Sequence, residues 1–182
     1  MLSCRIRGYL RNCLFVIAIA VMQMMFITGC GYRFTPGGEH IDKSIQTVFV
    51  DNFSNKTSEA YVENTFRSAF IDQFIKGRRF KLVDGRETAD AVFRGNIISI
   101  LATPLSYNKN NLTAEERVNV TFELILEEQG TKNVLWTDKN VSAYEDYPFT
   151  DLIMKEQNRK QALIKLAIDS AEREYRLMMS GF

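Results

Sequence analysis

Residues 117–127 read RVNVTFELILE, and along them apolar and polar side chains alternate almost without a break. Successive side chains of a β-strand point to opposite faces, so this stretch predicts a strand with one buried face and one wet face. Gln129-Gly130 indicates a turn. Residues 133–144 are then expected to return as the partner strand of a long hairpin.

The segments before and after this hairpin carry both strand and helix patterns. A long strand is expected at 91–101, where the apolar phase shifts near Ile97-Ile98 and indicates a β-bulge. Asn55-Lys56-Thr57-Ser58 offers capping side chains for a first helix. The further predicted elements are strands at 45–50 and 80–83 and amphipathic helices at 58–76 and 150–179. In the second helix, Asp169 with Arg173 and Glu172 with Arg176 are spaced to form i,i+4 ion pairs.

Together these elements predict an α+β fold. Their order is β-α-β-β-β-β-α, and the first strand–helix–strand unit favours a parallel pair. Two amphipathic helices packed on one face of a mixed four- to five-stranded sheet is the economical arrangement. A length of 182 residues corresponds to one domain of ordinary size, which we expect at 45–182.

The N-terminus has the features of an export signal. Three arginines precede an apolar run from Leu14 to Ile27. That run is shorter than the roughly 20 residues that a transmembrane helix needs. A basic start, a short apolar run and small residues before a cut predict a signal peptide over residues 1–29.

The end of this segment, Ile27-Thr28-Gly29-Cys30, resembles the bacterial lipobox. In such signals the cysteine thiol receives a diacylglycerol, the peptide is cut before it, and the new amine is acylated. We therefore expect lipidation at Cys30 and a lipid-proximal linker over 30–44. Gly31 in place of an aspartate resembles an outer-membrane address. The alternatives are an uncleaved anchor or an ordinary signal with an incidental cysteine.

Removal of residues 1–29 changes the charge balance of the chain. It takes away Arg5, Arg7 and Arg11 and leaves 20 basic and 22 acidic side chains, a net charge of −2. Proteins that neutralise nucleic-acid phosphates are strongly basic, so nucleic acid is not expected as a partner. Cys30 is then the one remaining cysteine, and no disulfide is expected.

Residues that carry catalysis or bind metals are scarce. His40 is the one histidine and falls in the linker, so neither a zinc site nor nucleophile–base catalysis is expected. The adjacent acids Glu115-Glu116 and Glu127-Glu128 are interpreted as solvated surface, and Trp136 as structural. The sequence therefore predicts a non-enzyme without cofactor or metal.

Several short stretches of the mature chain stand out in order. They are CGYRF at 30–34, VFVDNFSNKT at 48–57, ADAVFRG at 89–95, VLW at 134–136 and the stretch from Tyr144 to Tyr147. In this order and spacing they resemble the LptE family of lipopolysaccharide-assembly lipoproteins. The resemblance covers nearly all of 30–182 and implies two helices on one side of a mixed sheet.

The resemblance also implies a function. It implies a lipid-anchored outer-membrane protein on the periplasmic side, which plugs a large β-barrel translocon and helps to deliver lipopolysaccharide to the cell surface. The stretch 48–57 is also similar to lipoproteins that activate peptidoglycan synthases or assemble as secretion pores. An envelope enzyme is a third alternative, which the scarcity of catalytic residues disfavours.

A phosphorylated lipid calls for a few placed cations. Arg117 falls on the wet face of the central strand, Lys132 at the turn and Lys139 on the paired strand, so these three are the predicted lipopolysaccharide contacts. The next candidates are Lys76, Arg78 and Arg79. Ordinary solvated charge is the alternative for each residue, and cations that complement a helix C-terminus for the second group.

Overall fold

The computed structural model describes residues 41–109, 112–149 and 151–181. The predicted signal peptide and the lipidation site at Cys30 lie outside these residues. The elements in chain order are strands β1 (Thr47–Val50) and β2 (Ser54–Asn55), helix α2 (Val62–Gly77), strand β3 (Lys81–Leu82), a short 3₁₀ turn (Arg86–Thr88), strands β4 (Ala91–Tyr107), β5 (Thr113–Glu128) and β6 (Val134–Pro148), and helix α3 (Leu152–Ser180).

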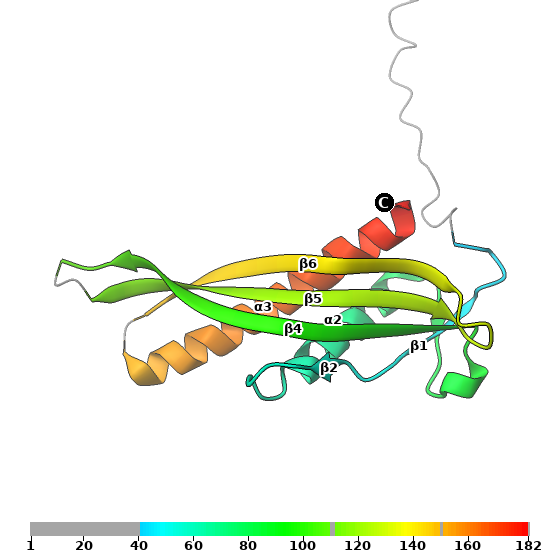
Figure 1. Ribbon diagram of the computed structural model, residues 1–182, viewed down its shortest axis with the longest axis horizontal. Coiled ribbons are helices and arrows are strands. Elements are labelled where there is room, and N and C mark those ends of the chain that lie inside the picture. The colour runs from blue at the N-terminus through cyan, green and yellow to red at the C-terminus, as the bar shows by residue number, and fades with distance from the viewer. Residues whose placement is uncertain (1–40, 110–111, 150, 182) are drawn as a thin grey trace, which may run out of the picture. The chain divides into compact units, whose positions relative to one another are not determined.

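The strands form one mixed sheet in the order β3-β1-β4-β5-β6, with β2 beside β4 (Figure 1). Strand β1 is parallel to both β3 and β4, which confirms the expected parallel pair. Strands β4, β5 and β6 form an antiparallel meander. The α+β class is confirmed, and the sheet has six strands rather than four or five because the two-residue β2 also joins it.

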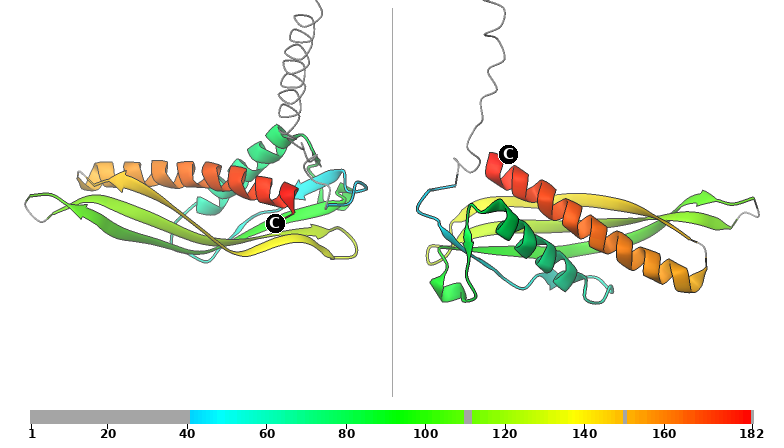
Figure 2. Two further views of the ribbon diagram at one scale, coloured as in Figure 1. Left: turned by 90° about the horizontal axis from the view of Figure 1, so that it is seen from above. Right: turned by 180° about the vertical axis from the view of Figure 1, so that it is seen from behind.

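Both helices lie on the same face of the sheet (Figure 2). Helix α2 places Phe66, Phe70 and Phe74 toward the strands, all nearly inaccessible to solvent. Phe66 meets Phe122 of β5 edge to face, with ring centroids 5.2 Å apart, and Phe70 lies 5.0 Å from Phe93 of β4. The long alternating strand therefore buries its apolar face under the two helices, as its pattern predicts.

Helix α2 begins at Val62, four residues later than the capping pattern predicts. The polar residues before it close a loop instead, in which the Asn55 side chain accepts the backbone N–H of Thr57 at 2.9 Å. Tyr61 then stands at the N-cap in the left-handed region, with φ 64°, and offers no side-chain cap. Local side-chain hydrogen bonds of Asn and Thr compete with the helix here and shorten it.

Strand β4 contains the expected bulge, since its register against β5 shifts between Ile97 and Ser99. The strand continues to Tyr107, beyond the expected end at residue 101. Its last residues are largely exposed on both faces, so no alternation marks them in the sequence.

Helix α3 shows one of the two expected i,i+4 ion pairs. Glu172 and Arg176 lie 3.9 Å apart, as predicted. The other expected pair does not form, because Asp169 lies 3.6 Å from Lys165 and Arg173 contacts Glu174.

Candidate functional site

Arg117 projects from the outer face of the sheet, the face opposite the helices. Its Nε and Nη2 donate to the two carboxylate oxygens of Asp146 on β6, at 2.7 and 2.9 Å. The guanidinium also stacks on Tyr144, 4.1 Å from the ring centroid. The hydrogen bonds from Arg117 hold the pKa of Asp146 below its usual value. The Arg117 side chain is thus fixed in place, and a phosphate would have to displace or share Asp146.

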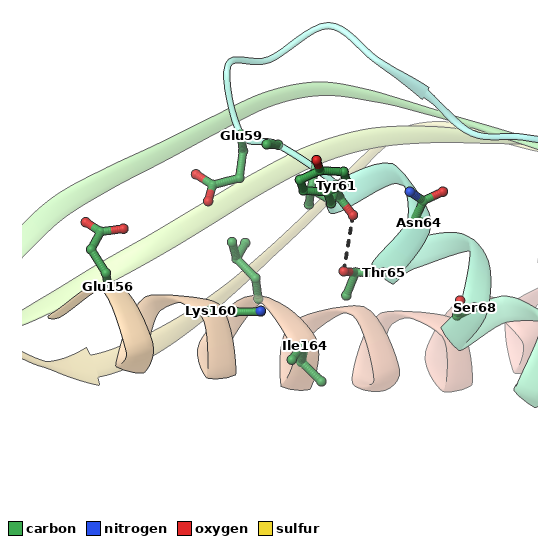
Figure 3. A pocket seen from close by; sticks show the side chains of 11 residues that line it. Glu59, Tyr61, Asn64, Thr65, Ser68, Glu156, Lys160 and Ile164 are labelled. Carbon is green, nitrogen blue, oxygen red and sulfur yellow. Dashed lines mark hydrogen bonds between the residues drawn. The ribbon is translucent and has the colours of Figure 1, made fainter. Parts of the chain in front are cut away.

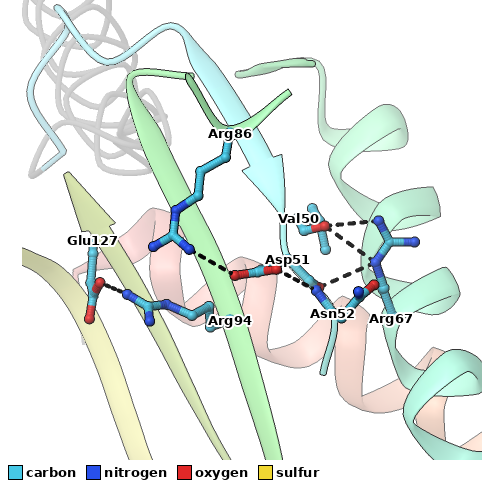
Figure 4. A network of polar contacts seen from close by, with 7 residues as sticks. All are labelled: Val50, Asp51, Asn52, Arg67, Arg86, Arg94 and Glu127. Atoms are coloured by element: carbon cyan, nitrogen blue, oxygen red, sulfur yellow. Dashed lines mark hydrogen bonds and ion pairs between the residues drawn. The ribbon is translucent and has the colours of Figure 1, made fainter. Parts of the chain in front are cut away.

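Lys132 lies at the other end of the hairpin, in the turn between β5 and β6. Its backbone adopts φ 59°, and its N–H donates to the carbonyl of Glu128 at 3.0 Å. The turn borders a hollow of about 330 Å³ that Arg86 and Glu127 also line. Both of these side chains are paired, Arg86 with Asp51 at 3.5 Å and Glu127 with Arg94 (Figure 4).

Lys139 is exposed on β6, between the positions that face Phe122 and Leu124 of β5. The three predicted contacts therefore share one hairpin but not one position. Arg117 and the turn after Glu128 are separated by roughly 36 Å of extended strand, at about 3.3 Å per residue. A single phosphate group cannot touch all three, so any common ligand must extend along the hairpin.

The second group of candidate cations lies at the C-terminal end of α2. Lys76 and Arg78 are exposed there. Arg79 instead donates to the backbone carbonyls of Ile45 at 2.9 Å and Asp42 at 3.3 Å, and it stacks on Phe80. Arg79 thus joins the start of the described chain to the end of α2.

The stretch at 48–57 acquires a structural role from Arg67 of α2. The Arg67 guanidinium donates to the carbonyl of Val50 at 3.0 Å and to that of Asp51 at 3.2 Å (Figure 4). These hydrogen bonds satisfy the backbone where β1 ends and fix the strand against the helix.

Glu116 corrects the interpretation of the paired acids as solvated surface. It is only 8% exposed and accepts hydrogen bonds from Tyr147 at 2.5 Å and Lys155 at 3.0 Å. Burial and the hydrogen bond to Glu116 raise the pKa of Tyr147 to about 12. The alternation from Val118 and Val120 extends to position 116, so the sequence held the signal for a buried side chain there.

A second buried acid, Glu174 of α3, was not singled out by the sequence. It is 2% exposed, and its Oε1 accepts from Nε of Arg173 at 2.8 Å. Burial raises the pKa of this carboxyl above its usual value. Ser170, one turn earlier, is equally buried and lies beside a hollow of about 300 Å³ between α3 and β6. Ser170 lies four residues after Leu166 and Glu174 four residues before Met178, so both continue the apolar stripe of α3, and only their polar side chains hide this in the sequence.

A groove of about 590 Å³ separates the start of α2 from α3 (Figure 3). Glu59 and Tyr61 line one side, and Glu156, Lys160 and Ile164 line the other. Tyr61 is 75% exposed, and its carbonyl accepts the hydroxyl of Thr65 at 3.3 Å.

Within residues 41–109, 112–149 and 151–181, no three His, Cys, Asp or Glu side chains gather as a metal site would require. Trp136 is 9% exposed and belongs to the core, as expected. No helix in this part of the chain has both the length and the apolar character to cross a membrane.

The comparison with protein families gives one match, over residues 45–178, to the model of LptE, described as lipopolysaccharide-assembly. The chain belongs to the LptE family. The match spans the sheet, α2 and nearly all of α3, so it confirms the resemblance inferred from the short stretches. The chain is therefore a lipoprotein of lipopolysaccharide assembly and of envelope biogenesis. Its family is one of lipoproteins rather than enzymes.

The chain is similar to solved structures at low sequence identity. Protein XCC0632 from Xanthomonas campestris is 6% identical, with a TM-score of 0.52 over 74% of this chain and 84% of that chain. The rare lipoprotein B from Shewanella oneidensis is 16% identical, with a TM-score of 0.48 over 73% of this chain and 93% of that chain. No curated protein sequence matches the chain.

Proposed function

We propose that this LptE-family chain is anchored in the outer membrane through lipid at Cys30 and plugs a β-barrel translocon that delivers lipopolysaccharide to the cell surface. The observation that carries the proposal is the family match over residues 45–178, which includes every described strand, α2 and α3 up to Met178. The lipobox at Cys30 supports the anchor, and Gly31 supports the outer-membrane destination.

The two faces of the sheet suit a plug. One face is closed by the helices and completes a core without help from a partner. The other face carries polar and charged side chains that pair across the strands, such as Arg117 with Asp146 and Asn96 with Glu123. A surface of this kind is compatible with a water-filled lumen, because several of its charges are paired across the strands and remain hydrated.

The cations of the hairpin are the proposed contacts to lipopolysaccharide phosphates. Lys132 and Lys139 are exposed, and Arg117 is held on the outer face by Asp146 and Tyr144. Their spacing along the hairpin suits a lipid that carries phosphates at separate positions. Charge-assisted hydrogen bonds to phosphate are strong, and those at exposed sites weaken as salt increases.

Affinity purification of the lipidated chain in detergent tests the partner. Mass spectrometry of the purified complex should identify an integral outer-membrane β-barrel. Recovery of a peptidoglycan synthase, or of the chain alone as an oligomer, would contradict the plug.

Lipopolysaccharide binding tests the contacts. The triple variant Arg117→Glu, Lys132→Glu, Lys139→Glu should bind more weakly than wild type at low salt, and the difference should shrink at high salt because screening removes the electrostatic part. The matched control is Lys43→Glu, Lys81→Glu, Lys109→Glu, which reverses the charge of three exposed lysines away from the β5–β6 hairpin. If the triple variant keeps its fold and binds as tightly as wild type, the contacts lie elsewhere, with Lys76, Arg78 and Arg79 the next to test.

A further inference from the structure

Strand β4 has neighbours on both sides along its first half and on one side along its second. We call residues 91–97 the covered half and residues 98–107 the open half. The covered half pairs with β5 on one side and with β1 and β2 on the other. The open half pairs with β5 as far as Tyr107, and no other described strand lies beside it.

Among the described residues, none forms a hydrogen bond with the outward backbone groups of Ile100 and Ala102 at this edge. In the covered half, the carbonyls of Phe93 and Ile97 accept the N–H groups of Asp51 and Lys56, each at 2.9 Å. Phe93 and Ile97 face buried positions of β5. After the bulge, Ile100 and Ala102 occupy the equivalent positions, because they pair with Val120 and Val118 of β5. Polar backbone groups therefore point away from β5 at Ile100 and Ala102.

Pro104, opposite Glu116, is the next residue of β4 whose backbone nitrogen points away from β5. Its missing N–H thus falls on the open side of the strand, where a proline does not disturb the ladder with β5. The proline ends the run of outward donors. The edge available to an added strand is therefore residues 99–103.

The open half lacks the charged side chains that normally protect a free edge. Residues 98–107 read ISILATPLSY and contain no charged side chain. Leu101 is 63% exposed and Tyr107 62% exposed. By contrast, β6 at the opposite edge of the sheet carries Asp138, Lys139, Glu145 and Asp146. Exposed edges without charge readily pair with another strand.

We propose that residues 99–103 of β4 bind an extended, uncharged segment of the outer-membrane β-barrel partner, which adds to the sheet as a strand beside Ile100 and Ala102. This inference rests on the proposed function for the identity of the partner. The added strand continues the row that β1 and β2 begin on the same side of β4. Main-chain hydrogen bonds supply the pairing, and Leu101 supplies an apolar contact.

A second copy of the chain fits this edge less well. Two copies related by a two-fold axis would pair their β4 strands antiparallel and point their chain starts in opposite directions. The described chain begins at the end of the sheet away from the β4–β5 turn (Figure 1). An anchor through Cys30 on a single membrane surface therefore favours a partner strand over a second copy.

The test uses the full lipidated chain, purified in detergent from cells, with Ala102→Pro as the central variant. This change removes the outward N–H of residue 102, and Ala102→Val is the matched control because it keeps that N–H. The barrel protein recovered per chain should be at least about tenfold lower for Ala102→Pro than for Ala102→Val, a difference of about 1.4 kcal/mol. Equal thermal unfolding of the two purified variants shows that both are folded.

A photoreactive residue at Leu101 provides a second readout, with one at the exposed Ile153 of α3 as its control. The cross-link from position 101 should map to one extended segment of the barrel, and the cross-link from position 153 should not. Equal barrel recovery for Ala102→Pro and Ala102→Val overturns the inference and leaves the proposed function standing. A cross-link from position 101 to a second copy also overturns it. A wild-type chain that recovers no barrel overturns the proposed function and this inference together.

Discussion

The covered and open halves of β4 are parts of one strand in opposite surroundings. Ala91, Phe93 and Ile97 are fully buried under the helices, while Leu101, Leu105 and Tyr107 are exposed. Both halves keep the same antiparallel partner, β5. The difference arises on the other side, where β1 and β2 end at the bulge. The comparison shows that β4 contributes to the core mainly through its covered half, while the open half has one strand neighbour and largely exposed side chains.

The largest expected loss of stability is at Phe122 of β5, which lies beside the covered half. Phe122 faces Ile97 and contacts the ring of Phe66. Phe122→Ala should lower the free energy of unfolding by about 3–5 kcal/mol because it leaves a cavity between the sheet and α2. Denaturant unfolding of the soluble chain without residues 1–30 measures this, with Thr121→Ala on the outer face as the control. A loss below about 1 kcal/mol would mean that this face of β5 is not part of the core.

Gly95 tests how tightly the covered half is packed. A Cβ at this position would lie 2.3 Å from Cε2 of Phe53, whose ring is buried between Phe70 and Phe93. Gly95→Ala should therefore cost about 1–3 kcal/mol through overpacking. At Gly85 a Cβ meets nothing closer than 3.5 Å, so Gly85→Ala should change the unfolding free energy little. Equal effects at the two glycines would contradict the close approach of Phe53.

Glu116 of β5 is buried and lies opposite Pro104 of the open half. Replacing it should lower the free energy of unfolding by an intermediate amount that depends on pH. Burial acts to raise its pKa, but the hydrogen bonds from Tyr147 and Lys155 and the charges of Lys155 and Arg159 outweigh burial, so the pKa lies below its usual value. A lowered pKa stabilises the fold above the unfolded-state value, and this stability is lost as the pH falls through the folded-state pKa. Glu116→Gln should cost about 1–2 kcal/mol at pH 7 and much less in acid.

Glu174 should behave in the opposite way, because burial raises its pKa. The folded state holds this proton more tightly than the unfolded state, so stability falls as the pH rises from the unfolded-state pKa through the folded-state pKa. Glu174→Gln removes this titrating carboxyl, so the free energy of unfolding should fall less between acid and neutral pH than it does in the wild type. Relative to the wild type, the variant should therefore be more stable at neutral pH than in acid. Melting temperatures of both variants between pH 3 and pH 8 check the two signs. Parallel curves for Glu116→Gln and Glu174→Gln would contradict the assignment.

The smallest effect is expected at Arg117. Its ion pair with Asp146 lies on the outer face, where both side chains contact water. Exposed ion pairs contribute little to stability, so Arg117→Ala should leave the denaturant midpoint nearly unchanged. A midpoint shift as large as that of Glu116→Gln would show that the pair supports the fold rather than a ligand.

The sequence predicts the covered half well and the open half poorly. Alternation from Val118 to Leu126 identifies β5 because one face is buried, and the phase shift at Ile97-Ile98 marks the bulge for the same reason. Residues 102–107 face solvent on both sides, so no period reveals that the strand continues.

The candidate lipopolysaccharide contacts were also predicted only in part. The sequence placed Arg117, Lys132 and Lys139 on one hairpin, but not the distances between them, which depend on how far the strands extend. The pairing of Arg117 with Asp146 depends on the register of β5 against β6, which local patterns do not encode. The burial of Glu116 could have been predicted, because Glu116 lies two residues before Val118 and therefore points to the same face of β5.

Hydrogen exchange of the lipidated chain, alone and in its purified membrane complex, tests the difference between the two halves most directly. Amides of residues 91–97 should be protected in both samples, since their ladders lie within the chain. The amides of Ile100 and Ala102 should exchange rapidly in the isolated chain and become protected in the complex. If these two amides exchange at the same rate in both samples, the open half is not the partner-binding edge.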